Sequence, residues 1–263
     1  MTYLFAIVLG LIQGLTEFLP VSSSGHLTLC EIAFGMSSGN VLYNVLLHVA
    51  TLLALVVIMR KQVWQVFSHP LEKPMRLLLL STIITGLVGL GVDHFVGASG
   101  NLLMVSIGFV VTGICLLSLH FFVKSKKYQP KPLTYKHAIV VGAMQGVAVL
   151  PGLSRSGSTL CAGVFSGADT KGSAEFSFLL SIPIILIGMT YEIYKGLKGG
   201  FEIAKQELGP ALVGFVVAFL SAIMSIKFMM RLVSKNRWLG FSIYLFLSAI
   251  VIIVVGICHK ILI

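Results

Sequence analysis

The chain has 263 residues, of which 57% are hydrophobic and only 11% are charged. Soluble domains carry about 25% charged residues, so this composition excludes a soluble globular protein and indicates a polytopic membrane protein. The net charge of +10 does not indicate nucleic-acid binding, because the basic residues cluster in short loops between apolar segments. We expect no nucleic-acid partner.

The first apolar segments are two short pieces, at about 1–19 and 23–34, separated by Pro20 and a run of serines. Each is short for a membrane span, which needs about 20 apolar residues. A broken pair of this kind is typical of a re-entrant hairpin whose tip is enclosed by protein or lines a wet cavity.

Three full spans are expected next. They lie at about 41–59, 77–92 and 102–123, and the first is followed by a loop with the basic residues Arg60, Lys61, Lys73 and Arg76. A basic segment, K-S-K-K-Y-Q-P-K-P-L-T-Y-K, then separates two halves of a single membrane domain. The first repeat covers about 1–124 and the second about 133–263.

The second half repeats the plan of the first. It has a broken pair at about 137–150 and 156–168, and then spans near 174–194, 210–230 and 238–258. Because three crossings is an odd number, the second half should be inverted relative to the first. The predicted fold is an all-α inverted-topology repeat, in which each half has a re-entrant helical hairpin and three transmembrane helices.

The positions of lysine and arginine predict the orientation. Most of the 19 basic residues fall on one side if the loops after the first, third and fifth spans are cytoplasmic together with the flanks of the second hairpin. Cytoplasmic loops carry an excess of positive charge. Both termini are therefore expected on the extracytoplasmic side.

One motif occurs twice. Residues 10–27 read G-L-I-Q-G-L-T-E-F-L-P-V-S-S-S-G-H-L, and residues 142–159 read G-A-M-Q-G-V-A-V-L-P-G-L-S-R-S-G-S-T. The glycines, glutamine, proline and serines coincide, but the charges do not. The first copy has Glu17 and His26, whereas the second has Arg155. If the two loops meet, these three side chains belong to one composite site.

The chemistry of these loops is typical of phosphate binding. Serines and glycines at the mouth of a half-helix offer hydroxyls and free N–H groups to an anion, and the positive helix end favours negative charge. Arg155 adds a planar fork that suits two phosphoryl oxygens. The loops therefore predict a diphosphate clamp. Its candidate binding residues are Ser22, Ser24, Gly25, Ser154, Ser156 and Gly157.

Hydrolysis needs more than binding, and His26 and Glu17 can provide it. A hydroxyl or a water attacks phosphorus while a group of intermediate pKa, such as His26, manages protons. A divalent ion such as Mg²⁺ would be held mainly by Glu17, the substrate oxygens and waters, because Gln13 is neutral.

Each of these features also has a structural interpretation. Serine and glycine serve capping and close helix packing in membranes, and Glu17 with Arg155 could be a structural ion pair. His48 in the first span and Glu175 at the start of the fourth are either interior polar residues or parts of the site. An inverted-repeat carrier that translocates an anionic lipid or a small anion without cleaving it fits the same architecture.

Three segments carry a family resemblance. Q-G-L-T-E-F-L-P-V-S-S-S-G-H and P-G-L-S-R-S-G-S-T, followed by E-F-S-F-L-L-S-I-P, closely resemble the undecaprenyl-diphosphate phosphatases, the bacitracin-resistance family of bacterial inner membranes. The resemblance covers essentially the whole chain. It implies hydrolysis of undecaprenyl diphosphate to undecaprenyl phosphate and inorganic phosphate, which recycles the carrier lipid of peptidoglycan synthesis. It also implies an extracytoplasmic site and a divalent cation, Mg²⁺ or Ca²⁺.

The resemblance assigns roles to individual residues. The family's acidic motif falls on Gln13 and Glu17, which we expect at the metal. Its serine and histidine fall on Ser23 and His26, and its arginine falls on Arg155. Glu17, Ser23, His26 and Arg155 are therefore the expected catalytic residues. Attack by the serine and attack by water both remain open, as does the oligomeric state, for which a homodimer is one option.

Overall fold

The structure, a computed structural model, describes residues 2–33, 41–96, 101–126, 128–198 and 208–259. These residues form eleven α-helices and no strand. The helices are α1 (Tyr3–Thr16), α2 (Ser23–Ala33), α3 (Val41–Ile58), α4 (Arg60–Phe67), α5 (Lys73–Val96), α6 (Leu102–Phe122), α7 (Tyr135–Val147), α8 (Arg155–Phe165), α9 (Thr170–Lys198), α10 (Leu208–Ser234) and α11 (Leu239–His259).

The long helices confirm the prediction of an all-α polytopic membrane protein. Among the described residues, α5, α6, α9, α10 and α11 are each long and apolar enough to cross a membrane, and α3 with α4 passes the same test as a bent pair. All six expected spans coincide with helices. The helices α5 and α9 extend several residues beyond the predicted spans, because polar residues at their ends continue the helical hydrogen bonding.

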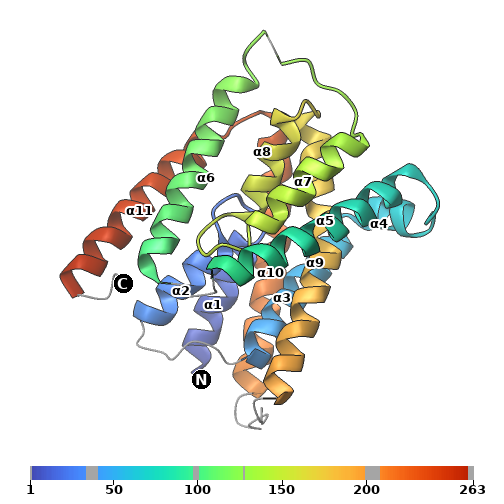
Figure 1. Cartoon of the computed structure of the whole chain (residues 1–263). Coiled ribbons are helices and arrows are strands. Elements are labelled where there is room, and N and C mark those ends of the chain that lie inside the picture. The colour runs from blue at the N-terminus through green and yellow to red at the C-terminus, as the bar shows by residue number, and fades with distance from the viewer. Residues whose placement is uncertain (1, 34–40, 97–100, 127, 199–207, 260–263) are drawn as a thin grey trace.

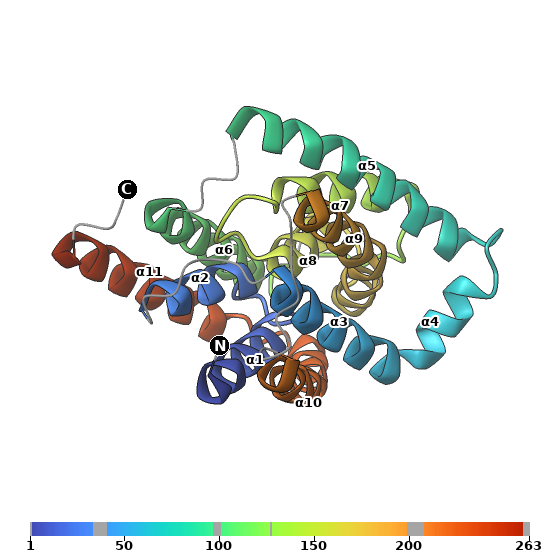
Figure 2. The same cartoon turned by 90° about the horizontal axis from the view of Figure 1, so that it is seen from below.

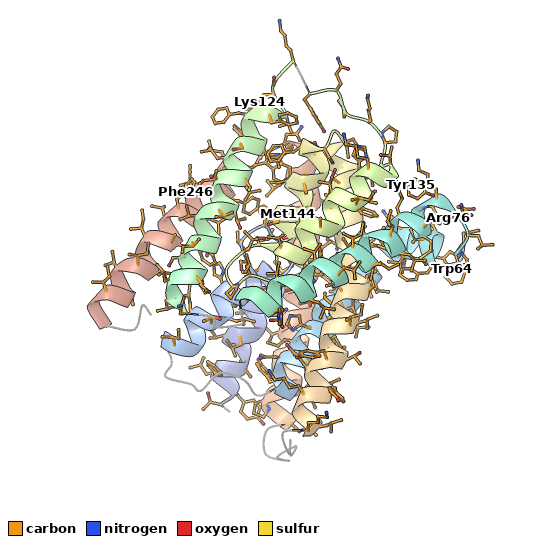
Figure 3. The ribbon with its side chains drawn as sticks, viewed as in Figure 1. Trp64, Arg76, Lys124, Tyr135, Met144 and Phe246 are labelled. Atoms are coloured by element: carbon orange, nitrogen blue, oxygen red, sulfur yellow. The ribbon has the colours of Figure 1, made fainter. Side chains whose placement is uncertain are left out.

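The predicted loop after Ile58 was wrong in one respect. Residues Arg60–Phe67 form α4, which turns by 88° from the direction of α3. This helix is amphipathic. Val66 packs into the main core, while Arg60 and Lys61 on the other faces are exposed. Trp64 projects from the outer edge of the bundle (Figure 3).

The two broken pairs form helical hairpins. In the first, α1 and α2 contact each other across residues 17–22, and in the second, α7 and α8 contact each other across residues 148–154. The hairpins enter the bundle from opposite ends, and their tips meet near its middle (Figure 1). Seen from below, α8 lies close to the centre of the molecule (Figure 2), and most of its residues are buried.

Each hairpin packs against a long helix of the other half, α1 along α10 and α7 along α5. Glycines allow the close approach. A Cβ on Gly10 would lie 2.5 Å from the Gly214 oxygen of α10, and one on Gly142 would lie 2.7 Å from the Ser81 oxygen of α5. Equivalent glycines of the two motif copies therefore allow equivalent helix contacts.

Hydroxyl groups reinforce both contacts in the same way. Thr85 Oγ1 of α5 donates a hydrogen bond to the Gly142 carbonyl at 3.0 Å, and Ser221 Oγ of α10 donates to the Gly10 carbonyl at 3.4 Å. Such interhelical bonds are typical of membrane helix bundles, which gain little from hydrophobic contact between helices. They fix the depth to which each hairpin enters.

The two ends of the bundle carry different parts of the chain. The helix α1 begins at the lower end, and α11 ends at the left side beside the start of α6 (Figure 1). Lys124, just after α6, lies at the opposite end (Figure 3). Between these ends α6 and α11 lie side by side, and Phe246 of α11 covers Gly113 of α6, where a Cβ would lie 2.8 Å from its ring.

Gly10→Ala is expected to destabilise the protein, because the new methyl group would press on a backbone oxygen of α10. Overpacking of this kind costs about 1–3 kcal/mol. The matched control is Gly91→Ala in α5, where a Cβ meets nothing within 4 Å and the exchange favours the helix by about 0.5–1 kcal/mol. Thermal unfolding in detergent should show a lower midpoint for the first variant only. Equal midpoints would contradict the close packing of α1 on α10.

Candidate active site

The two serine loops touch each other at the tips of the hairpins. Ser156 Oγ donates a hydrogen bond of 2.9 Å to the Leu19 carbonyl, and a Cβ on Gly157 would lie 3.1 Å from the ring of Pro20. Pro20 of the first motif copy thus lies against Gly157 of the second. The condition for a composite site, that the loops meet, is fulfilled.

Both loops begin their second helix with the same hydrogen bonds. The Ser22 hydroxyl accepts from the Gly25 N–H at 3.4 Å, and the Ser154 hydroxyl accepts from the Gly157 N–H at 3.2 Å. These are N-caps. In each loop the capping hydroxyl also bonds the serine two residues later, at 3.4 Å and 3.3 Å. The serines therefore have a capping role that is independent of any ligand.

Ser22 has a φ of 68°, a conformation that is uncommon for residues other than glycine and collects at functional sites. It turns the chain sharply between Val21 and α2. Ser23, the first residue of α2, thereby points its hydroxyl back toward the end of α1 and donates to Glu17 Oε2 at 2.7 Å.

Glu17 is the centre of the polar network. Its side chain is buried, and its two oxygens accept hydrogen bonds from three residues. Arg155 Nη2 donates to Oε1 as an ion pair, while Gln13 Nε2, at 3.0 Å, and Ser23 Oγ share Oε2. The guanidinium and the carboxylate come from different halves of the chain, so their contact joins the two motif copies.

A cavity of about 260 Å³ opens beside this network. Its walls come from the two hairpin tips with the first residues of α2 and α8, and from α1, α3 and α9. The lining residues are Thr16, Glu17, Ser22, Ser23, Ser24, His48, Ala148, Val149, Leu153, Ser154, Arg155, Ile184, Ile185, Gly188, Met189 and Glu192. One wall is rich in hydroxyls and charge, and the wall from α9 is mainly apolar.

His26 does not line this cavity. Its Nδ1 lies 2.8 Å from the Ser22 carbonyl, which can only accept, so Nδ1 donates and Nε2 accepts from the Tyr244 hydroxyl at 2.5 Å. The ring stacks between Phe109 and Tyr244. It lines an apolar groove of about 410 Å³ formed with α6 and α11. Sequence reasoning did not identify Tyr244 as its partner.

The remaining predicted residues divide into two groups. Ser22, Ser24 and Ser154 line the cavity, whereas Gln13, Gly25, Ser156 and Gly157 support its walls from behind. Glu175 lies elsewhere, 3.9 Å from Lys171 and beside a separate cavity. Glu192 also lines the cavity. No motif marks this residue in the sequence, because it stands at the end of an apolar run.

A divalent cation fits this site as an ion shared with a ligand. Within the described ranges, His, Cys, Asp and Glu side chains form no group of three or more that could hold a metal. Glu17 offers a carboxylate, and the neighbouring Gln13 Oε1 is buried without a hydrogen-bond partner. Mg²⁺ commonly binds one or two carboxylates and completes its shell with waters and substrate phosphates. Gln13 and Glu17 suit that arrangement.

Comparison with known proteins identifies the family. The family model described as "Bacitracin resistance protein BacA" matches residues 6–251. The chain belongs to this family. It is similar to undecaprenyl-diphosphatases of Carboxydothermus hydrogenoformans (37% identical over 97% of this chain and 98% of the relative) and Bacteroides thetaiotaomicron (35%, 97% and 99%). It is also similar to undecaprenyl-diphosphatase 1 of Shouchella clausii (35%, 97% and 96%). The BacA match spans both serine loops.

Removing one partner of the Glu17–Arg155 pair should destabilise the protein more than removing both. A fully buried charge that loses its partner costs about 3–5 kcal/mol, and the cost is smaller here because 23% of the Arg155 side chain is exposed. Glu17→Gln and Arg155→Met should each lower the thermal midpoint. The double variant should have a thermal midpoint above that of either single variant. Strictly additive losses would mean that the pair is not energetically coupled.

Proposed function

We propose that this protein is a membrane-embedded lipid diphosphatase that hydrolyses undecaprenyl diphosphate to undecaprenyl phosphate and inorganic phosphate. The observation that carries the proposal is the contact of Ser23 and Arg155 with Glu17 at the wall of a polar cavity. The names of the BacA-family relatives support the substrate. The reaction recycles the carrier lipid for peptidoglycan synthesis and accounts for bacitracin resistance.

The diphosphate would bind between the two serine loops. The N-terminal ends of α2 and α8 begin at Ser23 and Arg155, so both helices direct their positive ends toward this place. Arg155 uses Nη2 for Glu17, which leaves the rest of its guanidinium for phosphoryl oxygens. Ser22, Ser24 and Ser154 can donate from the lining. The apolar wall from α9 suits the start of the polyprenyl tail.

Proton transfer begins at Ser23 in this proposal. Its hydroxyl already donates to Glu17 Oε2, so the carboxylate is in place to take the proton when Oγ attacks the terminal phosphorus. The bond from this phosphorus to the bridging oxygen breaks and undecaprenyl phosphate leaves. A water then hydrolyses the phosphoserine, which releases inorganic phosphate and restores the Ser23 hydroxyl. If a water attacks instead, the same carboxylate can accept from it. For His26 a proton-transfer role requires that Nε2 exchange the Tyr244 hydroxyl for a water or a substrate group.

A divalent cation, Mg²⁺ or Ca²⁺, is part of the proposal. Glu17 with Gln13 would hold it, and when bound it neutralises charge that develops on the phosphoryl oxygens. The charges of the lining support this part of the proposal, because Arg155 is accompanied by two acidic residues, Glu17 and Glu192. Such a site repels a diphosphate unless further positive charge is supplied.

The hydrolysis is tested by phosphate release from undecaprenyl diphosphate in detergent with Mg²⁺. Glu17→Ala and Arg155→Ala should each lower kcat/KM by about 10²-fold or more, the size expected for removing a group that stabilises transition-state charge. Ser234→Ala, at an exposed helix end, should leave activity unchanged. No release from folded wild-type protein would reject the proposal and leave the carrier as the next candidate.

Ser23→Ala separates serine from water attack in the same assay. Loss of turnover, together with a phosphoserine trapped on the wild-type protein, supports a serine nucleophile. Full turnover excludes it.

We further propose that the protein lies in the bacterial inner membrane, with the cavity open to the extracytoplasmic side and both termini on that side. The excess of basic residues near Lys124 supports this orientation. Lys198, at the end of α9, would then be extracytoplasmic.

Single cysteines at these two exposed lysines test the orientation in a variant without the native cysteines. In intact cells, a membrane-impermeant thiol reagent should label Lys198→Cys and spare Lys124→Cys until the cells are opened. Labelling of only Lys124→Cys in intact cells would reverse the orientation.

A further inference from the structure

A second histidine lies in the wall of the active-site cavity. His48 comes from the middle of α3, an element that carries neither serine loop, and it lines the cavity together with Ser23 and Arg155. Its Nδ1 lies 2.9 Å from the Asn44 carbonyl one turn earlier in the same helix. A carbonyl can only accept, so Nδ1 carries a proton and donates it to this bond.

The Nε2 edge of His48 is free to meet a ligand. Because Nδ1 turns toward its own helix backbone, the opposite edge of the ring points away from α3. In the part of the chain that the structure describes, no group forms a hydrogen bond with Nε2. His26 differs in both respects, since both of its ring nitrogens are engaged and its ring lines another groove.

The charges that line the cavity favour an additional group that can bind phosphate. Among the charged lining residues, one arginine stands against two glutamates, and the arginine is already paired with Glu17. A diphosphate entering the cavity therefore meets little net positive charge from the protein. An imidazole that can carry a proton is the one lining group besides Arg155 that can become cationic.

We propose that His48 is a substrate-binding residue whose Nε2 forms a hydrogen bond with the terminal phosphate of the lipid diphosphate. This inference rests on the proposed diphosphatase function. An imidazole Nε2 can donate a hydrogen bond when it carries a proton and accept one when it does not. The bond forms with the imidazolium as donor or with the P–OH group as donor, and the Asn44 carbonyl holds the ring in the orientation that both require.

Binding by His48 predicts a larger effect on KM than on kcat. With undecaprenyl diphosphate in detergent and Mg²⁺, His48→Ala should raise KM about tenfold, which corresponds to about 1.4 kcal/mol, and should change kcat by less than about threefold. His48→Gln keeps a hydrogen-bonding group, so its KM should lie between those of the wild type and His48→Ala. The matched control is His69→Ala, since His69 bonds the Gln65 carbonyl one turn earlier in the same way but is exposed and outside the cavity.

A second measurement keeps the proposal testable if His48→Ala fails to fold. In wild-type protein with ¹⁵N-labelled histidine, the ring signal of His48, assigned by its absence in His48→Gln, should shift when inorganic pyrophosphate is added. An unchanged KM in folded His48→Ala, or an unshifted signal at saturating pyrophosphate, overturns the role of His48. If wild type is active in either case, the proposed function stands. Only an inactive wild type would reject both.

Discussion

The ion pair between Glu17 and Arg155 is the constraint on which the rest of the structure depends. Each charge alone would be costly at bilayer depth, and among the described residues each pairs with an opposite charge from the other half of the chain. The hairpin tips must therefore meet. The contacts of Gly10 with α10 and of Gly142 with α5 set the depth of each hairpin. The serines that cap α2 and α8 fix the two loops around the ion pair.

Much of this arrangement could be predicted from the sequence, because its signals are local. Apolar runs of sufficient length predicted the six spans, and the breaks at the serine runs predicted the two hairpins. The repetition of one motif with different charges predicted one composite site for Glu17, His26 and Arg155; Glu17 and Arg155 are in contact, whereas His26 lines another groove. The same repetition accounts for the two helix N-caps, since Ser22 and Ser154 occupy equivalent positions in the motif and make equivalent hydrogen bonds.

The features that could not be predicted from the sequence depend on contacts between distant segments. His26 stands next to the serines in the chain, yet its ring orientation is set by Tyr244, 218 residues away. His48 and Glu192 reach the cavity through the packing of α3 and α9, for which no motif exists. The helix α4 was missed because a short basic segment with one buried valine resembles a loop until its packing partner is known.

The packing of α1 along α10 has a consequence for how the chain is made. The helix α1 finds its main neighbour only after residues 208–234 have been synthesised. Until then Glu17 also lacks Arg155, because that residue lies 138 positions later. Domains usually begin to fold from the N-terminus during synthesis, but this hairpin has to wait for nearly the whole chain. Its final position in the membrane is therefore a late event of biogenesis.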